Sequence, residues 1–163
     1  MITLRNAQES DLEGIRHIYN DAIANTTAVY EYEPFTTDFI EQWFKGKEDQ
    51  HFPVIVAEVD GTVAGFATYG TFRARAAYFR TMEHSVYVHP ELRRQGIGKI
   101  LLKEIISVAQ SNQVHVLVGG IDAENELSIK LHLDEGFKIA GTIHQAAWKF
   151  ERWLDLVFME KIL

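Results

Sequence analysis

The stretch "HPELRRQGIGKILLKEI", residues 89–105, joins a cationic segment with two glycines directly to an apolar pattern that has helical spacing. The N–H groups in the first turn of a helix lack partners within the helix and carry a partial positive charge, so they bind anions. Glycine also lets a phosphate approach the backbone, because it has no Cβ. Arg93 to Lys99 therefore fit a loop that wraps a diphosphate, although an ordinary tight turn with solvated cations fits the same residues.

Two other kinds of phosphate-binding loop fit this stretch poorly. A P-loop requires Gly-x-x-x-x-Gly-Lys followed by Ser or Thr, whereas Gly98 and Lys99 are followed by Ile100. A dinucleotide-binding loop requires a third glycine three residues after the second, and Leu101 occupies that place. Nucleotide hydrolysis and NAD binding are therefore disfavoured.

Upstream of this stretch, the sequence predicts two helices and several strands. A short strand at residues 2–5 precedes a helix with Ser10 as its N-cap, since Glu13 follows three residues later and apolar residues then recur on one face. A second helix follows Thr37. Asp60-Gly61 between two β-branched runs is a strong hairpin signal, and "TMEHSVYVH" predicts the strand that leads into the opening stretch.

Downstream, the pattern predicts a helix, a buried strand, a second helix and two final strands. The buried strand is "VHVLVGGI", the second helix "NELSIKLHLDEGF" ends at Gly136, and the last strands lie around "KIAGTI" and "WLDLVFMEKI". A strand, a helix and another strand in succession predict a parallel crossover. The first of these helices should turn one face inward, formed by Leu101, Leu102, Ile105, Ile106 and Ala109.

The composition predicts one domain over residues 1–163 that binds a small ligand. The chain is 47% hydrophobic with a formal net charge of -7 and dispersed cations, which argues against a nucleic-acid or membrane partner. No apolar run approaches the length of a membrane span. The absence of cysteine excludes disulfides and a cysteine nucleophile and fits the cytoplasm. The seven histidines do not cluster at metal-binding spacing, so we expect no metal.

Arg93, Gly96 and Gly98 match, in order, the phosphate loop of the GNAT superfamily of acyl-CoA-dependent N-acetyltransferases, and the order of predicted elements also resembles that superfamily. The resemblance implies an α/β (α+β) fold with a central, twisted, mixed but mostly antiparallel sheet of about seven strands, flanked by about four helices. It also implies acetyl-CoA as cosubstrate. A second motif, in "NELSIKLHLDEGF", adds Asn125 and Ser128. The implied cofactor-binding residues are Val86, Tyr87, Val88, Arg93, Arg94, Gln95, Gly96, Ile97, Gly98, Lys99, Asn125 and Ser128.

Within that superfamily the chain most resembles the phosphinothricin acetyltransferases, which acetylate the amine of amino acids with a tetrahedral head group such as phosphinothricin, methionine sulfoximine or methionine sulfone. The resemblance rests on "IYN" at residues 18–20, "VAEVDGTVAGFA" at 56–67, "RARAAYFRTMEHSVYV" at 73–88 and "LHLDEGF" at 131–137. One departure is "WKFERWLD", where the family has small residues and this chain has Phe150 and Glu151. That departure concerns the substrate mouth or a subunit contact.

The resemblance assigns roles to particular residues. Glu83, on the strand face opposite His84 and Val86, is the implied general base that deprotonates the amine, directly or through water. A backbone N–H near Val86 holds the developing oxyanion while the amine attacks acetyl-CoA directly in a ternary complex. His132 stands where most of the superfamily has a tyrosine acid. It either protonates the departing sulfur, orients the cofactor or packs within its helix.

A cationic segment supplies the implied acceptor site. Arg73 and Arg75 are placed to clamp the carboxylate and head group of an amino acid, because the guanidinium forks bind such groups in a bidentate way. Glu83 shares this site, and Tyr30 is a weaker candidate that is equally compatible with the core. The implied substrate-binding residues are Tyr30, Arg73, Arg75, Tyr78, Thr81 and Glu83.

Two further functions remain open at this level. One is a related acetyltransferase for a polyamine or a protein N-terminus, although Arg73 and Arg75 suit a polycation poorly. The other is a noncatalytic acyl-CoA-binding sensor, against which Glu83 and His132 argue. The family also implies a homodimer, to which Trp148 and Trp153 contribute if they do not belong to the core.

Overall fold

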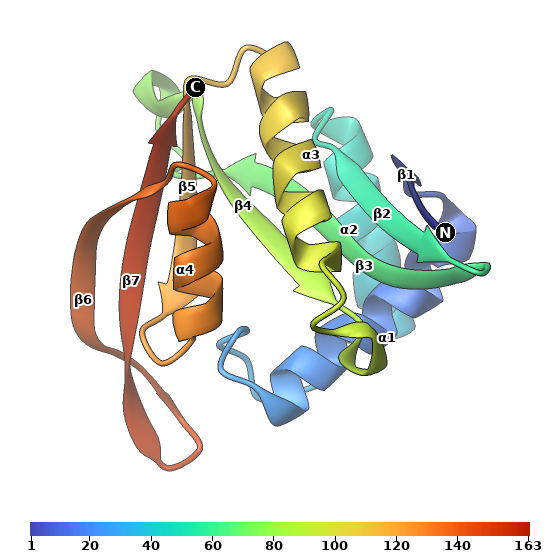
Figure 1. Ribbon diagram of the computed structural model, residues 1–163, viewed down its shortest axis with the longest axis horizontal. Coiled ribbons are helices and arrows are strands. Elements are labelled where there is room, and N and C mark those ends of the chain that lie inside the picture. Colours follow the sequence, from blue (N-terminus) through green and yellow to red (C-terminus); the bar gives the residue numbers. More distant parts are fainter.

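The computed structural model describes all of residues 1–163 and contains one seven-stranded sheet (Figure 1). The strands follow the order β1-β2-β3-β4-β5-β7-β6, and the only parallel neighbours are β4 and β5. The predicted parallel crossover and the mostly antiparallel sheet are therefore confirmed. The strands are β1 (Ile2–Asn6), β2 (Val54–Val59), β3 (Thr62–Thr71), β4 (Thr81–Val88), β5 (Val116–Asp122), β6 (Lys138–Lys149) and β7 (Arg152–Ile162).

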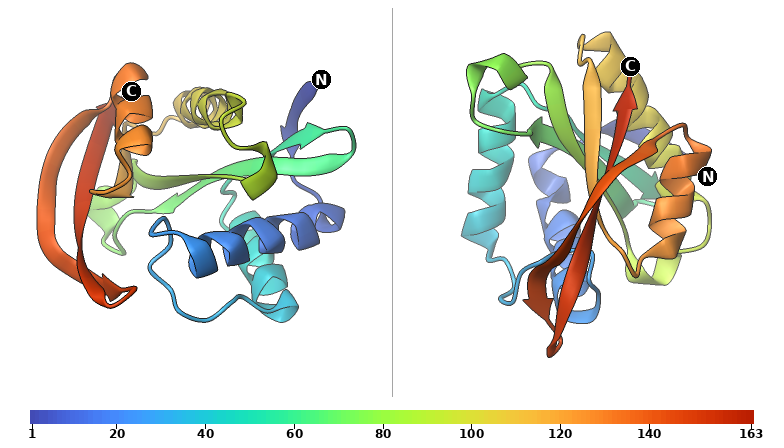
Figure 2. Two further views of the ribbon diagram at one scale, coloured as in Figure 1. Left: turned by 60° about the horizontal axis from the view of Figure 1, so that its bottom comes forward. Right: turned by 90° about the vertical axis from the view of Figure 1, so that its left-hand side faces the viewer.

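Helices cover both faces of the sheet. Figure 2 shows α3 and α4 on one face and α1 and α2 on the other. The predicted inward face of α3 is confirmed, since Leu101, Leu102 and Ile105 are fully buried and α3 packs on β2, β3 and β4. No helix is both long and apolar enough to cross a membrane. The helices are α1 (Leu12–Asn25), α2 (Thr37–Asp49), α3 (Ile97–Ser111) and α4 (Glu126–Asp134), and short 3-10 turns occupy Glu9–Asp11, Ala76–Tyr78 and Pro90–Leu92.

The sheet divides between β4 and β5. These strands pair only over Thr81–Glu83 and Val116–Val118, near the start of both, and then diverge (Figure 1). Beyond Glu83, β4 keeps its partner β3 but has lost its partner on the other side. The start of α3 and one side of α4 face this division, so the fold itself produces a groove there.

The start of α1 differs from the prediction. Ser10 is not the N-cap, because it lies inside the 3-10 turn Glu9–Asp11 and α1 begins at Leu12. The physical reason is Asp11, whose buried carboxylate accepts the backbone N–H of Gln8 at 2.8 Å and two guanidinium bonds from Arg5 at 2.7 and 2.9 Å. The Arg5 bonds keep the pKa of Asp11 below its ordinary value. A pairing between β1 and the helix start therefore overrides the local capping pattern.

The last two strands are joined by a strained turn. β6 extends well beyond "KIAGTI" to Lys149, and its partner β7 starts at Arg152. The two connecting residues, Phe150 and Glu151, both have positive φ values of 52° and 59°. A two-residue turn of this kind favours Asn and Gly, and side chains with a Cβ are strained in it.

We expect Glu151→Gly to raise the free energy of unfolding by about 0.5 to 1 kcal/mol, because glycine adopts positive φ without a Cβ penalty. Urea unfolding of the two proteins measures the difference. Gly61→Ala provides the reciprocal control, since Gly61 has φ 78° in the other hairpin with open space around it. That variant should lose about 1 kcal/mol. A Glu151→Gly protein no more stable than the parent would contradict the assignment of strain.

Candidate active site

The start of α3 offers free N–H groups to the groove. Its N-cap is Gly96, which has φ 82° and no side chain that accepts a hydrogen bond. The first bond of the helix runs from the N–H of Ile100 to the carbonyl of Gly96 at 3.1 Å. The N–H groups of Ile97, Gly98 and Lys99 therefore have no partner in the chain. Such a helix start binds an anion through its N–H groups and its dipole.

A groove of about 1080 Å³ extends from this helix start along β4. Its walls come from β4, the start of α3, the start of α4, the end of α1 with the loop after it, and the turn between β6 and β7. Every cofactor-binding residue that the sequence predicted lines the groove except Gln95, and His132 lines it as well. Residues that the sequence did not point to also contribute, among them Thr26, Thr27, Glu124, Leu127, Leu131 and Arg152.

The cations of the loop are not equally free. Arg93 donates to Asp21 of α1 at 2.5 Å, so its charge is matched within the protein and it holds the loop against α1. Lys99 lies 3.7 Å from a carboxylate oxygen of Glu135. Arg94, which has φ 63°, makes no ion pair within the chain. Of the three predicted cations, Arg94 is thus the one whose charge is entirely available to a ligand.

The opposite wall is the first turn of α4. The side chain of Asn125 accepts the backbone N–H of Ser128 at 3.1 Å and so caps the helix. One turn later, His132 is buried and uses both ring nitrogens: Nδ1 lies 2.7 Å from the carbonyl of Ser128 and Nε2 lies 2.9 Å from Nε2 of His84 on β4. Burial lowers the pKa of His132, and this effect outweighs the hydrogen bond to Ser128. The two histidines connect β4 to α4 across the division of the sheet.

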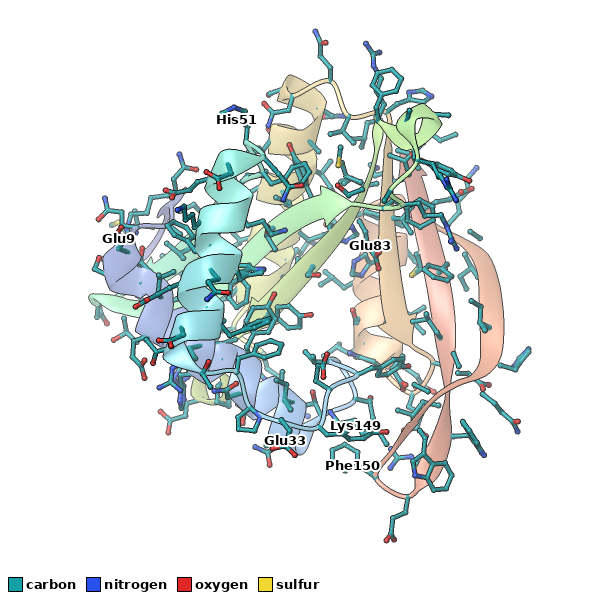
Figure 3. All side chains as sticks on the ribbon, turned by 180° about the vertical axis from the view of Figure 1, so that it is seen from behind. Glu9, Glu33, His51, Glu83, Lys149 and Phe150 are labelled. Atoms are coloured by element: carbon teal, nitrogen blue, oxygen red, sulfur yellow. The ribbon has the colours of Figure 1, made fainter.

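Glu83 lies where β4 and β5 stop pairing (Figure 3). Its side chain is on the sheet face opposite that of its strand neighbour His84, which packs against His132 of α4 and against Phe137. Burial raises the pKa of Glu83 above its ordinary value of 4.5, and the positive charge of Arg73 offsets part of that effect. A carboxylate with a raised pKa is a better proton acceptor, which is what a general base for an ammonium group needs.

The β3–β4 loop, which leads into the strand that carries Glu83, has exposed cations. Arg73 and Arg75 make no ion pair or side-chain hydrogen bond within the chain, and Arg73 lies over the ring of Phe72, 5.4 Å from its centroid. Tyr78 packs edge-on against the same ring and is 41% exposed. This loop is separate from the groove: none of the predicted substrate residues, including Thr81 and Glu83, lines the groove walls.

Tyr30 has a partner that the sequence did not indicate. Its hydroxyl donates to Asp122 at the end of β5 at 2.7 Å, and burial raises its pKa. In the same region the ammonium of Lys149 donates to the carbonyls of Thr26 and Val29 at 2.9 and 2.7 Å. These bonds fasten the loop after α1 to the β6–β7 turn, where Figure 3 shows Lys149. Tyr30 therefore positions a loop beside the groove rather than packing in the core.

Further side chains lie in and beside the turn between β6 and β7. Phe150 lines the groove, with the ammonium of Lys149 5.0 Å from its ring centroid, and Arg152 pairs with Glu124 at 2.6 Å. Trp148 and Trp153 pack edge-on against each other and are 47% and 57% exposed, so they do not belong to the core. No three His, Asp or Glu side chains lie together in a way that holds a metal ion.

Comparisons with known proteins agree with this geometry. The model of the acetyltransferase (GNAT) family matches residues 14–137. An L-methionine sulfoximine/L-methionine sulfone acetyltransferase of Pseudomonas paraeruginosa is 42% identical over 97% of this chain and 92% of its own length. The crystal structure of a ribosomal-protein-alanine N-acetyltransferase from Brucella melitensis is 45% identical, with a TM-score of 0.97 over 99% of both chains.

A third relative has a bound cofactor. The structure of YncA from Salmonella typhimurium with its cofactor acetyl-CoA is 38% identical, with a TM-score of 0.97 over 100% of this chain and 94% of that one. The chain described here belongs to the acetyltransferase (GNAT) family. The family and the fold that the phosphate-loop motif implied are thereby confirmed.

Proposed function

We propose that this chain is an acetyl-CoA-dependent N-acetyltransferase for the amine of a small amino acid with a tetrahedral, oxygen-bearing head group, of the phosphinothricin, methionine sulfoximine or methionine sulfone type. The observation that carries the proposal is the groove of about 1080 Å³ that starts at the uncapped N-terminus of α3 and follows β4, the strand that also carries Glu83. The named activity of the Pseudomonas relative supports the choice of acceptor.

The lining of the groove suits the chemistry of acetyl-CoA. The free N–H groups of Ile97, Gly98 and Lys99, with the unpaired charge of Arg94, provide donors for a pyrophosphate. The backbone of Val86–Val88 has lost its β5 neighbour and so has an open edge for an amide-bearing pantetheine arm. When bound, acetyl-CoA supplies an activated thioester at the end of that arm.

In the proposed mechanism, Glu83 takes a proton from the acceptor ammonium, directly or through water, and the neutral amine attacks the thioester. A backbone N–H near Val86 stabilises the oxygen on which negative charge develops. Transfer is direct within a ternary complex, since the chain has no cysteine to hold an acetyl group in between. Glu83 is the proposed base because it combines a raised pKa with a place at the division of the sheet.

We expect Arg73→Ala and Arg75→Ala each to raise the KM for the amino-acid acceptor by roughly 10- to 100-fold, since a hydrogen bond to a charged group contributes about 1.5 to 3 kcal/mol. The KM for acetyl-CoA should stay within roughly threefold of the parent value, because neither arginine lines the groove. Arg80→Ala is the matched control: Arg80 ends the same loop and lies over Phe79. Equal acceptor KM values in the parent and the three variants would refute the proposed clamp.

A second candidate function is acetylation of a protein N-terminus, which the name of the Brucella relative favours. The two are separated by acetyl-CoA-dependent release of thiol with L-phosphinothricin, methionine sulfoximine, methionine sulfone, methionine, spermidine and a peptide with N-terminal alanine. We expect saturable turnover with the three tetrahedral-headed amino acids. Turnover with the peptide or spermidine alone would keep the cofactor and overturn the acceptor.

We further propose that the enzyme acts in the cytoplasm as a homodimer. The support for the dimer is the pair Trp148 and Trp153, which lie directly opposite each other on β6 and β7 and are both exposed. A single species with the mass of one chain, by light scattering at enzyme assay concentrations, would refute the dimer.

A further inference from the structure

The buried pair His84 and His132 has a protonation pattern that its hydrogen bonds determine. Nδ1 of His132 lies 2.7 Å from the carbonyl of Ser128. A carbonyl oxygen only accepts, so the proton of this bond belongs to Nδ1 of His132. In the neutral ring Nε2 is then bare, and the bond of 2.9 Å between the two Nε2 atoms must take its proton from His84.

The surroundings keep both rings neutral. His84 and His132 are 4% and 5% exposed, and Phe137 packs against both, with ring centroids 5.1 and 5.0 Å away. With its proton on Nε2, His84 leaves Nδ1 bare, and that atom is buried without a hydrogen-bond partner. Burial lowers the pKa of His84 to about 3 and His132 lowers it further; the nearby carbonyl of Val118 acts in the opposite direction, but no side-chain hydrogen bond of His84 reaches it.

Gly119 of β5 makes room for the pair. A Cβ at this position would stand 2.9 Å from Cε1 of His84 and 3.7 Å from Nε2 of His132. The first distance is too short for any side chain. The backbone of β5 therefore closes around the imidazoles, and the pair occupies a defined space between β4, β5 and α4.

From this geometry we infer that His84 is a positioning residue: it holds His132 as the neutral Nδ1–H tautomer with both nitrogens engaged inside the protein, so that His132 presents no N–H to the groove. His132 then orients the α4 wall, which carries Asn125 and Ser128, and is not the acid for the departing sulfur. The inference deepens the proposed function and rests on it for the meaning of the groove. The departing thiolate takes its proton from solvent. A thiol such as that of cysteine has an ordinary pKa of about 8.5, so it is mostly protonated near neutral pH without a dedicated acid.

The first test is the NMR spectrum of the full-length protein with ¹⁵N-labelled histidine and no ligand. We expect a protonated Nδ1 and a bare Nε2 on His132, a protonated Nε2 on His84, and a scalar coupling between the two Nε2 nuclei through their hydrogen bond. A His132 ring with its proton on Nε2, or the absence of the coupling, would overturn the inference. His115→Gln, at an exposed histidine outside the site, assists assignment and should leave these signals unchanged.

The second test separates the donor from mere packing. His84→Gln keeps an N–H at a similar place, whereas His84→Met fills the space without one. By calorimetry, the Gln variant should bind acetyl-CoA within about threefold of the parent and the Met variant about tenfold more weakly, the size expected when a buried acceptor loses its donor. Equal affinities of the two variants would contradict the inference, and the spectrum decides it independently if the Met variant fails to fold.

The third test concerns the acid role. His132→Gln cannot donate a proton as an acid but can accept the bond from His84, so kcat at saturating acetyl-CoA should fall less than about tenfold. General acid catalysis contributes roughly 10²- to 10⁴-fold, and a loss of that size would assign the acid to His132 and refute the inference. Spectra and acetyl-CoA affinities need no acceptor, so a failure of the proposed acceptor is distinguishable from a failure of the histidine pair.

Discussion

Glu83→Gln is expected to lower kcat with methionine sulfoximine by roughly 10²- to 10⁴-fold, the usual contribution of a general base. Glutamine keeps the size of the side chain but takes up no proton. The Kd for acetyl-CoA should stay near that of the parent, because Glu83 does not line the groove. Steady-state kinetics at saturating cosubstrate, with calorimetry for binding, measure both quantities.

The pH dependence of kcat/KM provides a second test of Glu83 as the base. Burial raises the pKa of Glu83 above 4.5, so the carboxylate is protonated at a higher pH than an exposed glutamate. Because the base acts only when ionised, kcat/KM should fall as the pH drops through this raised pKa, and Glu83→Gln should abolish that acid limb. If Glu83→Gln unfolds at the same urea concentration as the parent, its changed pH profile does not come from a loss of stability.

Glu160→Gln is the matched control for this experiment. Glu160 pairs with Val118 from β7, as Glu83 pairs with Val118 from β4, so both carboxylates belong to neighbours of the same β5 residue. The control should retain the parent kcat and the parent pH profile. If Glu83→Gln also retained full turnover across the pH range, Glu83 would not be the base.

Gly96→Val is expected to weaken acetyl-CoA binding by about 100-fold, or about 2.7 kcal/mol. Gly96 has φ 82° at the N-cap of α3, a conformation that costs an L-residue roughly 1 to 2 kcal/mol and a β-branched one more. The variant relieves this strain by turning the loop, which moves the free N–H groups of Ile97 and Gly98 away from the ligand. Calorimetric titration with acetyl-CoA measures the change.

Gly98→Ala provides the control in the same loop. A Cβ on Gly98 would stand 3.5 Å from Val88 and 3.8 Å from Leu131, which is ordinary contact, and Gly98 does not have a positive φ. Its affinity for acetyl-CoA should remain within about threefold of the parent, less than 1 kcal/mol. If Gly96→Val bound acetyl-CoA as tightly as Gly98→Ala, the helix start would not be the pyrophosphate site.

The features that local sequence patterns record were predicted well. The start of α3 follows from glycines and cations placed before an apolar helical repeat, and the positive φ values at Asp60 and Gly61 follow from the hairpin signal. In both cases the residues that decide the structure are neighbours in the chain. The end of β6 was placed too early, because its register breaks after Ile143 and its side chains are exposed from Lys138 to Ala146, so no alternation of buried and exposed residues marks the strand.

Contacts between distant segments were not predictable in the same way. Arg93 meets Asp21, which is 72 residues away, and Lys149 reaches the carbonyl of Thr26 across 123 residues. No local pattern marks Asp21 or the carbonyl of Thr26 as a partner, because carboxylates on helices and carbonyls in loops occur throughout the chain. The motif thus identified Arg93 correctly as part of the loop but did not reveal that its charge is already matched.

The most direct test of the proposed chemistry is identification of the product by mass spectrometry after incubation with acetyl-labelled acetyl-CoA and methionine sulfoximine. We predict labelled acetyl on the α-amine of the amino acid, formed by the parent enzyme and greatly reduced with Glu83→Gln. Tight binding of acetyl-CoA with no labelled product from any amine in the acceptor series would contradict the catalytic function and leave a protein that only binds the cofactor.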